Sequence, residues 1–173
     1  MHAFGAPIQW RSGVLWMVLV FGVFAYQSVA VWIALSIAWI SVMLVHELGH
    51  AYVARKLNYE VESIVVGGFH GRCEMEAPDY EWHDCAIAWG GVAAQLALAL
   101  PAAIFLWIAY PSLTPEMKVT LLMLSKFNAI VACFNLLPLA GFDGRIAWRV
   151  IPLSLDWWRA RRVTNRALKK WLK

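Results

Sequence analysis

The segment His46–His50 reads HELGH, and its residue types and spacing are those that bind a metal ion. On a helix, residues i and i+4 lie one above the other on the same face, so the two imidazoles can hold one ion together. Glu47 lies next to them and can take a proton from a water molecule. The segment therefore predicts zinc-dependent hydrolysis, with His46 and His50 as metal ligands and Glu47 as the catalytic base.

A catalytic zinc ion has three protein ligands and one open position for water, so a third ligand must come from elsewhere in the chain. Asp143 is the leading candidate, because it lies in a turn-forming segment, residues 135–144, NLLPLAGFDG. Pro138 ends the preceding helix, and Gly141 and Gly144 permit a turn that brings the carboxylate back toward the core. A charged side chain at membrane depth costs about 2.5–3.5 kcal/mol even on the mildest scale, and a shared cation would offset that cost.

The composition is that of an integral membrane protein. The chain has 173 residues, of which 61% are hydrophobic and 15% are charged, whereas soluble domains carry about 45–50% apolar and about 25% charged residues. The 11 tryptophans also favour a membrane, because Trp is enriched at the membrane–water boundary. The net charge of +4 comes from a basic C-terminal segment, which indicates contact with a membrane surface rather than with nucleic acid.

The apolar stretches predict an all-α membrane protein with about four transmembrane helices. No charged residue lies between residues 12 and 45, and because one span needs about 20 helical residues, this stretch must fold back, most simply at Tyr26–Ser28. Ser28–Ala30 also resembles the cleavage site of a signal peptide, but cleavage there would leave the mature chain starting inside the second span. We therefore expect four helices, at residues 8–26, 29–57, 85–110 and 116–137.

Two segments outside these spans have other patterns. Residues 58–84 contain the β-branched run Ser63–Val66, followed by Gly67 and Gly68, which predicts a short β-hairpin. The basic tail has a weak apolar stripe at helical spacing, formed by Trp157, Ala160, Thr164, Ala167 and Trp171. It predicts an amphipathic helix on an anionic membrane surface, with a solvated basic helix as the alternative. We thus expect a membrane-embedded domain at residues 1–155, with its core at 29–145, and a basic surface helix at 156–173.

The basic residues also predict the orientation in the membrane. With four spans, both termini lie on one side, and every Lys and Arg except Lys118 and Lys126 lies on that side too. The positive-inside rule places this side, with the hairpin and the catalytic end, in the cytoplasm. We expect a multi-pass protein of the cell (inner) membrane.

Three features together resemble the site-2 protease family of intramembrane zinc metalloproteases. They are HELGH on a membrane helix, a glycine-bearing hairpin after it, and an Asn-Leu-Leu-Pro…Asp-Gly segment that ends a later span. The likeness covers roughly residues 29–145 and is to a small form of the family without PDZ or CBS modules. It implies cleavage of transmembrane segments of other membrane proteins by metal-activated water, with one Zn²⁺ ion, in regulated intramembrane proteolysis.

The resemblance also assigns roles to individual residues. It makes Asp143 the third zinc ligand and Glu47 the base, and it places Asn135 near the substrate. Gln95 stands where the family has an asparagine in its middle helix, and we expect it to bind substrate as well. The chain departs from the family at Ala140 and Gly141, where the family often has proline, and at Val92, where the family has proline after the glycine.

A helical substrate must unwind before its backbone can be cut, because its peptide groups are hydrogen-bonded within the helix. The hairpin could bind the unwound segment as an added strand. The residues that we expect to bind substrate in this way are Val65, Val66, Gly67 and Gly68.

Two other functions are compatible with the sequence. A catalytically silent relative could act as a membrane scaffold or chaperone, although it would have no reason to keep Glu47. A metal transporter or sensor would spread its ligands along a path, whereas these ligands gather at one depth. For the protease, the expected partners are a membrane-protein substrate with a transmembrane helix and the lipid bilayer, and not nucleic acid.

Overall fold

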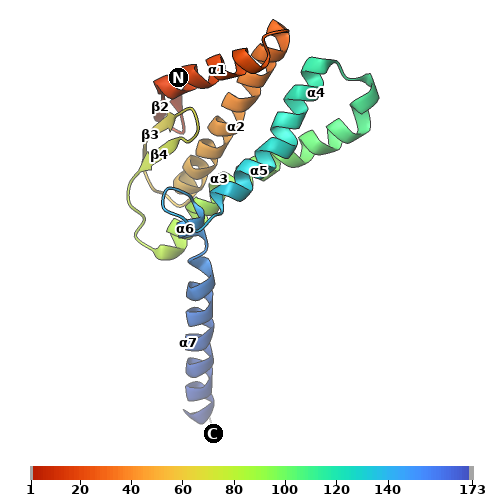
Figure 1. Cartoon of the computed structure of the whole chain (residues 1–173). Helices are drawn as coiled ribbons and strands as arrows, with labels where there is room; N and C mark the ends of the chain where they lie inside the picture. The colour runs from red at the N-terminus through yellow and green to blue at the C-terminus, as the bar shows by residue number, and fades with distance from the viewer. Residues whose placement is uncertain (1, 172–173) are drawn as a thin grey trace.

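The computed structural model describes the backbone of residues 2–171 and the side chains of residues 2–165. Within them, three helical stretches are long and apolar enough to cross a membrane (Figure 1). The first is α2 (Val29–Lys56), and the second is α3 (Glu81–Ala109), which a 3-10 turn extends to Ser112. The third combines α4 (Pro115–Leu122), a π-helical turn η2 (Met123–Phe127) and α5 (Asn128–Asn135). These stretches agree with an integral membrane protein and coincide with the last three predicted spans.

The first predicted span is shorter than expected. Residues 8–10 belong to a strand, so the helix α1 runs only from Ser12 to Phe24. A helix of 13 residues is about 20 Å long, less than the roughly 30 Å of a hydrocarbon core. The break at Tyr26–Ser28 is confirmed, and Ser28 begins α2 by accepting a hydrogen bond from the backbone nitrogen of Val31, at 3.3 Å. The predicted count of four spans is therefore not confirmed.

A four-stranded sheet lies against α2. Its order is β1 (His2–Ala3), β2 (Ala6–Trp10), β3 (Val61–Val66) and β4 (Arg72–Met75). The antiparallel pair β3 and β4 confirms the predicted hairpin. Strand β2 was not predicted, and it runs parallel to β3 with Trp10 opposite Val66. The fold is therefore mostly helical with a small sheet, rather than all-α.

The buried core lies between the sheet and α2. Trp39 and Val42 of α2 belong to one apolar cluster with Ile64 and Val66 of β3, and none of the four is more than 6% exposed. The indole nitrogen of Trp39 also donates a hydrogen bond to the backbone oxygen of Gly68, at 2.7 Å. These contacts hold the sheet against α2 just before HELGH.

Glycines let α2 and α3 approach each other closely. A Cβ atom added at Gly90 would lie 2.7 Å from the backbone oxygen of Gly49, and one added at Gly49 would lie 2.7 Å from Cβ of Ala94. Small residues allow such close packing of membrane helices. The Gly- and Ala-rich start of the third predicted span thus lies directly against HELGH.

Two further helices follow α5. They are the single turn α6 (Gly144–Ala147) and the long helix α7 (Val150–Trp171), which begins before the predicted boundary at residue 156. Figure 1 shows α7 extending away from the body at the end where α5 meets α6. In the predicted apolar stripe Trp157 is 53% exposed, while the side chains of Ala167 and Trp171 and all of residues 172–173 lie outside the described part. The membrane-surface position of this helix stays a prediction.

Candidate metal centre

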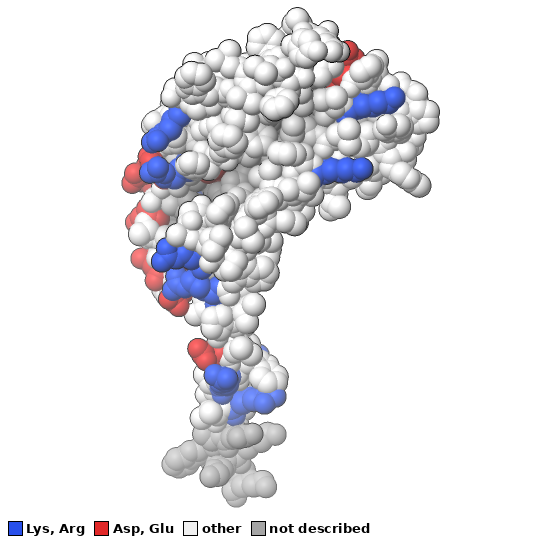
Figure 2. Space-filling view, in the orientation of Figure 1, with Lys and Arg blue, Asp and Glu red and all other residues white. Residues whose placement is uncertain are grey.

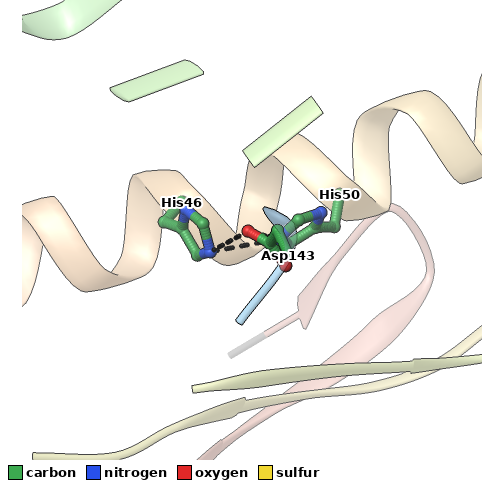
Figure 3. Close-up of side chains that lie close together, drawn as sticks. All are labelled: His46, His50 and Asp143. Carbon is green, nitrogen blue, oxygen red and sulfur yellow. Dashed lines mark hydrogen bonds and ion pairs between the residues drawn. The ribbon is translucent and has the colours of Figure 1, made fainter. Parts of the chain in front are cut away.

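The two histidines and the distant aspartate converge on one point. The Nε2 atoms of His46 and His50 lie 3.1 Å apart, and Oδ2 of Asp143 lies 3.2 Å from the first and 3.4 Å from the second. Figure 3 shows the Asp143 carboxylate directed at the two imidazole rings, which project from neighbouring turns of α2. The structure therefore brings together the three predicted metal ligands, although Asp143 lies 93 residues after His50 in the sequence.

The second nitrogen of each imidazole is held by a carbonyl oxygen. Nδ1 of His46 lies 3.1 Å from the side-chain oxygen of Gln95, and Nδ1 of His50 lies 2.7 Å from the backbone oxygen of Ile87. A carbonyl oxygen only accepts hydrogen bonds, so each Nδ1 must carry the hydrogen and each Nε2 keeps its lone pair. This is the arrangement by which proteins orient metal-binding histidines.

The three ligand atoms fit a zinc ion. Two imidazole lone pairs and a carboxylate oxygen face one another at 3.1–3.4 Å, and these electron-rich atoms repel unless a cation lies between them. Tetrahedral zinc with bonds of about 2.0–2.2 Å has its ligand atoms about 3.3 Å apart. The observed spacing and the donor types therefore match one zinc ion.

The charge state of Asp143 also suits a metal ligand. Burial alone would raise the pKa of this carboxyl group, but hydrogen bonds donated by His46 and His50 lower it when Nε2 carries a hydrogen, and a cation bound in the same place acts in the same direction. Asp143 is therefore ionised, as a carboxylate ligand must be.

The turn that delivers Asp143 depends on glycine. Gly141 has φ of +91°, in the left-handed region that favours glycine. At Gly144 a Cβ atom would lie 2.5 Å from the backbone oxygen of Leu137, so that a larger residue would force the segment apart. The predicted role of both glycines in this turn is confirmed.

A cleft of about 510 Å³ opens onto the metal ligands, and Glu47 lines it. Glu47 is only 4% exposed, and Gly71 lies so close that a Cβ atom there would be 2.6 Å from Cγ of Glu47. Cys73 lines the same cleft, and burial, with the nearby charges of Glu47 and Glu74, raises the pKa of its thiol to about 12. The thiol is therefore neutral, whereas the carboxyl group of Glu47, next to the two histidines in the sequence, can exchange protons in the cleft.

The residues predicted to bind substrate lie in three different places. Asn135 lines the cleft, with its amide nitrogen 3.4 Å from Nδ1 of His46. Gln95 is completely buried behind His46, and its side-chain oxygen reaches the imidazole. Its predicted contact with substrate stays a prediction, which this position does not favour.

The expectation for the hairpin needs correction. Val65 and Val66 lie on β3, which is paired with β2 on one side and β4 on the other, so β3 offers no edge to a peptide. The cleft is lined by Phe69–Cys73 and by Met75, and not by Gly67 or Gly68. Within the described residues, the sheet edge beside the cleft is that of β4.

Sequence reasoning missed two residues that shape the site. The backbone oxygen of Ile87 carries no sequence signal, because every residue has one. At Gly91 a Cβ atom would lie 2.7 Å from Cε1 of His46 and 2.6 Å from Cε1 of His50. The Gly90–Gly91 pair was a usable signal, since adjacent glycines in a membrane helix mark a close approach by another group.

Comparison with known proteins supports this site. No protein-family model matches the chain. In sequence it is 27% identical over 149 residues to the zinc metalloprotease MJ0392 of Methanocaldococcus jannaschii. The match covers 85% of this chain and 43% of that protein, so the chain spans less than half the length of this relative.

A comparison of structures gives the fold. The chain superposes on the site-2 protease from Methanocaldococcus jannaschii with a TM-score of 0.67 and 23% sequence identity. The superposition covers 87% of this chain and 69% of the other. The chain therefore has the site-2 protease fold, and the resemblance to the site-2 protease family that its motifs predict is confirmed.

Proposed function

We propose that the chain is an intramembrane zinc endopeptidase that cleaves transmembrane segments of other membrane proteins. The observation that carries the proposal is the convergence of His46, His50 and Asp143 within 3.1–3.4 Å, with Glu47 beside them in the same cleft. One Zn²⁺ ion is the proposed cofactor. Because helices that could cross a membrane carry the site, the proposed substrates are membrane proteins, as in regulated intramembrane proteolysis.

Each residue of the site has a separate task in this mechanism. Zinc, when bound, acts as a Lewis acid that lowers the pKa of water to about 7 and polarises a carbonyl group. Glu47 takes the proton of the attacking water and passes it to the leaving amine. Gln95 and the backbone of Ile87 hold the imidazoles of His46 and His50, and the Asn135 amide lines the cleft, where it can donate a hydrogen bond to the substrate backbone.

The proposed orientation places both termini and the catalytic end in the cytoplasm, at the cell (inner) membrane. Figure 2 shows Lys and Arg side chains over the side of the sheet, near α6 and along the part of α7 that it draws in colour, with others on the side of α4. This distribution supports the orientation through the positive-inside rule. The proposal includes a membrane-embedded domain at residues 1–155 and a C-terminal helix that lies on the anionic bilayer surface, with the exposed Trp157 as one of its contacts.

The proposed place for an unwound substrate is the outer edge of β4. This strand pairs with β3 alone among the described strands, and Arg72, Cys73 and Met75 line the cleft. A peptide added to this edge would form backbone hydrogen bonds with β4. It would then run past Glu47 and the metal ligands, which line the same cleft.

Proline substitutions along β4 test this docking edge. Successive backbone N–H groups of a strand point to opposite sides, so Arg72→Pro, Cys73→Pro and Glu74→Pro remove donors from the two edges in turn. Substitution of an outward donor should slow cleavage by about fivefold, from about 1 kcal/mol per hydrogen bond, with zinc content unchanged. Substitution of an inward donor should weaken the hairpin itself and lower thermal stability. If no position lowers cleavage without loss of zinc or stability, β4 is not the docking edge.

Removal and return of the metal tests the proposed activity. The purified chain should contain one equivalent of zinc, measured by elemental analysis, and a chelator should remove it. The chain should cut proteins of a membrane fraction in detergent when zinc is bound, should stop when zinc is removed, and should recover when one equivalent is returned. A scaffold or transporter of the same fold would bind the ion but yield no new peptides, which would refute the protease assignment.

A further inference from the structure

The segment that carries Asp143 is fastened to its surroundings by side chains that the proposed mechanism does not use. It leaves the end of α5 at Leu136, passes Asp143, and continues through α6 to Arg149. Eight residues of loop and one helical turn have little stability of their own. The carboxylate can stand beside the imidazoles only if tertiary contacts hold this segment.

The first of these contacts is a hydrogen bond across the base of the loop that carries Asp143. The indole nitrogen of Trp148 donates a hydrogen bond to the backbone oxygen of Leu136, at 2.6 Å. The two residues flank Asp143, so the bond joins the two ends of the loop. Gly144 allows this closure because a Cβ atom at this position would collide with the backbone of Leu136 and Leu137.

The second set of contacts attaches α6 to α3. The indole nitrogen of Trp89 donates to the backbone oxygen of Ala147, at 3.1 Å, and the thiol of Cys85 donates to that of Ile146, at 3.3 Å. Carbonyl groups at the end of a helix lack partners within the helix, and α3 supplies a donor to each of these two; the oxygen of Ile146 also accepts a hydrogen bond from the backbone nitrogen of Arg149, at 3.0 Å. The rings of Trp89 and Trp148 also meet edge to face, with centroids 5.5 Å apart.

The third contact is ionic. Arg149 pairs with Glu81, and its second guanidinium nitrogen lies 3.6 Å from Asp84. Glu81, Cys85 and Trp89 are spaced four residues apart, so they lie along one face of α3. The contacts between α3 and the Asp143 segment described above therefore all come from one face of α3.

Helix α3 is then the common support of all three metal ligands. It holds His50 through Ile87 and His46 through Gln95, and it holds the Asp143 segment through Trp89. We propose that Trp89, Trp148 and Arg149 are positioning residues, here called the Asp143 clamp, which set the third ligand in place before the metal binds. The inference rests on the zinc site of the proposed function, and it concerns metal affinity rather than cleavage.

The clamp acts by preorganisation. Without the clamp, the loop would have to become ordered when zinc binds. The free-energy cost of that ordering would lower the zinc affinity. Loss of an outer contact around a metal site typically lowers metal affinity by about 10–100-fold. Arg149 should contribute least, because its ion pairs are partly exposed and exposed pairs stabilise weakly.

The test is a double-mutant cycle on zinc affinity, measured by competition with a chromophoric chelator in detergent. Trp148→Phe and Trp89→Phe keep an aromatic ring and remove the indole donor. Each should lower zinc affinity by about 10–100-fold in the otherwise unchanged chain. Each should have no further effect when Asp143 is already replaced by alanine, since the clamp acts only through Asp143.

A matched control comes from the other end of α3, where Trp107 is 83% exposed. Trp107→Phe should leave zinc affinity unchanged, and Arg149→Lys should restore part of the affinity lost in Arg149→Gln. Equal losses in the presence and absence of Asp143, or unchanged affinity in both Trp148→Phe and Trp89→Phe, would overturn the clamp. The cycle needs no substrate, so a failure of the protease assignment would appear separately, in the cleavage experiment.

Discussion

Glu47→Gln is expected to abolish cleavage and to leave zinc bound. Glutamine has nearly the same shape as glutamate, so it fits the close contact with Gly71, but it cannot take a proton from water. Loss of a general base costs about 100- to 10,000-fold in rate. The proposed metal ligands are His46, His50 and Asp143, so the metal content should stay at one equivalent per chain.

The measurement compares the membrane proteomes of cells that produce the unchanged chain and cells that produce Glu47→Gln. Substrates should accumulate uncut in the variant, and their products should disappear. Glu62→Gln is a matched control, because it makes the same chemical change at an exposed position of β3. The proposed role of Glu47 is refuted if both variants leave the same peptides as the unchanged chain, or if Glu47→Gln loses its zinc.

Asp143→Ala should lose the activity and bind zinc much more weakly. This substitution removes the one carboxylate among the three ligands and leaves His46 and His50 alone. The loss of zinc affinity should exceed the roughly 10–100-fold that an outer contact contributes. Asp143→Asn should fall between alanine and the unchanged chain, because its side-chain oxygen can still reach the ion but carries no charge.

Zinc titration of the purified variants in detergent measures this effect. Asp156→Ala serves as the control, since that carboxylate is exposed on α7 and pairs with Arg159, away from the cleft. Its zinc affinity should equal that of the unchanged chain. Full zinc binding by Asp143→Ala would show that the third ligand is another residue, and the arrangement in Figure 3 would then not be the metal-bound one.

Some features of this protein follow from short stretches of sequence. The HELGH segment places two imidazoles on one face of a helix wherever that helix lies, because the spacing of residues on a helix is fixed by its geometry. Length and hydropathy predicted α2, α3 and the α4–α5 stretch in the same way. The N-terminal cap of α4 is another local feature. The side chain of Thr114 accepts a hydrogen bond from the backbone nitrogen of Met117.

Other features were predicted only in part. The turn around Gly141 could be foreseen, but the direction in which it sends Asp143 depends on contacts with α3. The hairpin was predicted, but its pairing with β2 was not, and this pairing leaves β4 as the open edge of the hairpin. Gln95 was assigned to substrate because its distance from His46 could not be judged from its position in the chain.

The sequence by itself determined the chemistry available to this protein. It places two imidazoles and a carboxyl group that can act as a base on adjacent turns of an apolar helix, and another carboxylate after a helix that ends before Pro138. Tertiary structure alone decided that these groups meet, that carbonyl groups from α3 hold both imidazoles, and that two tryptophans hold the segment of the third ligand. The physical reason is that residue spacing specifies neighbours within a helix or turn, whereas contacts between distant segments depend on how all the helices and the sheet pack at once.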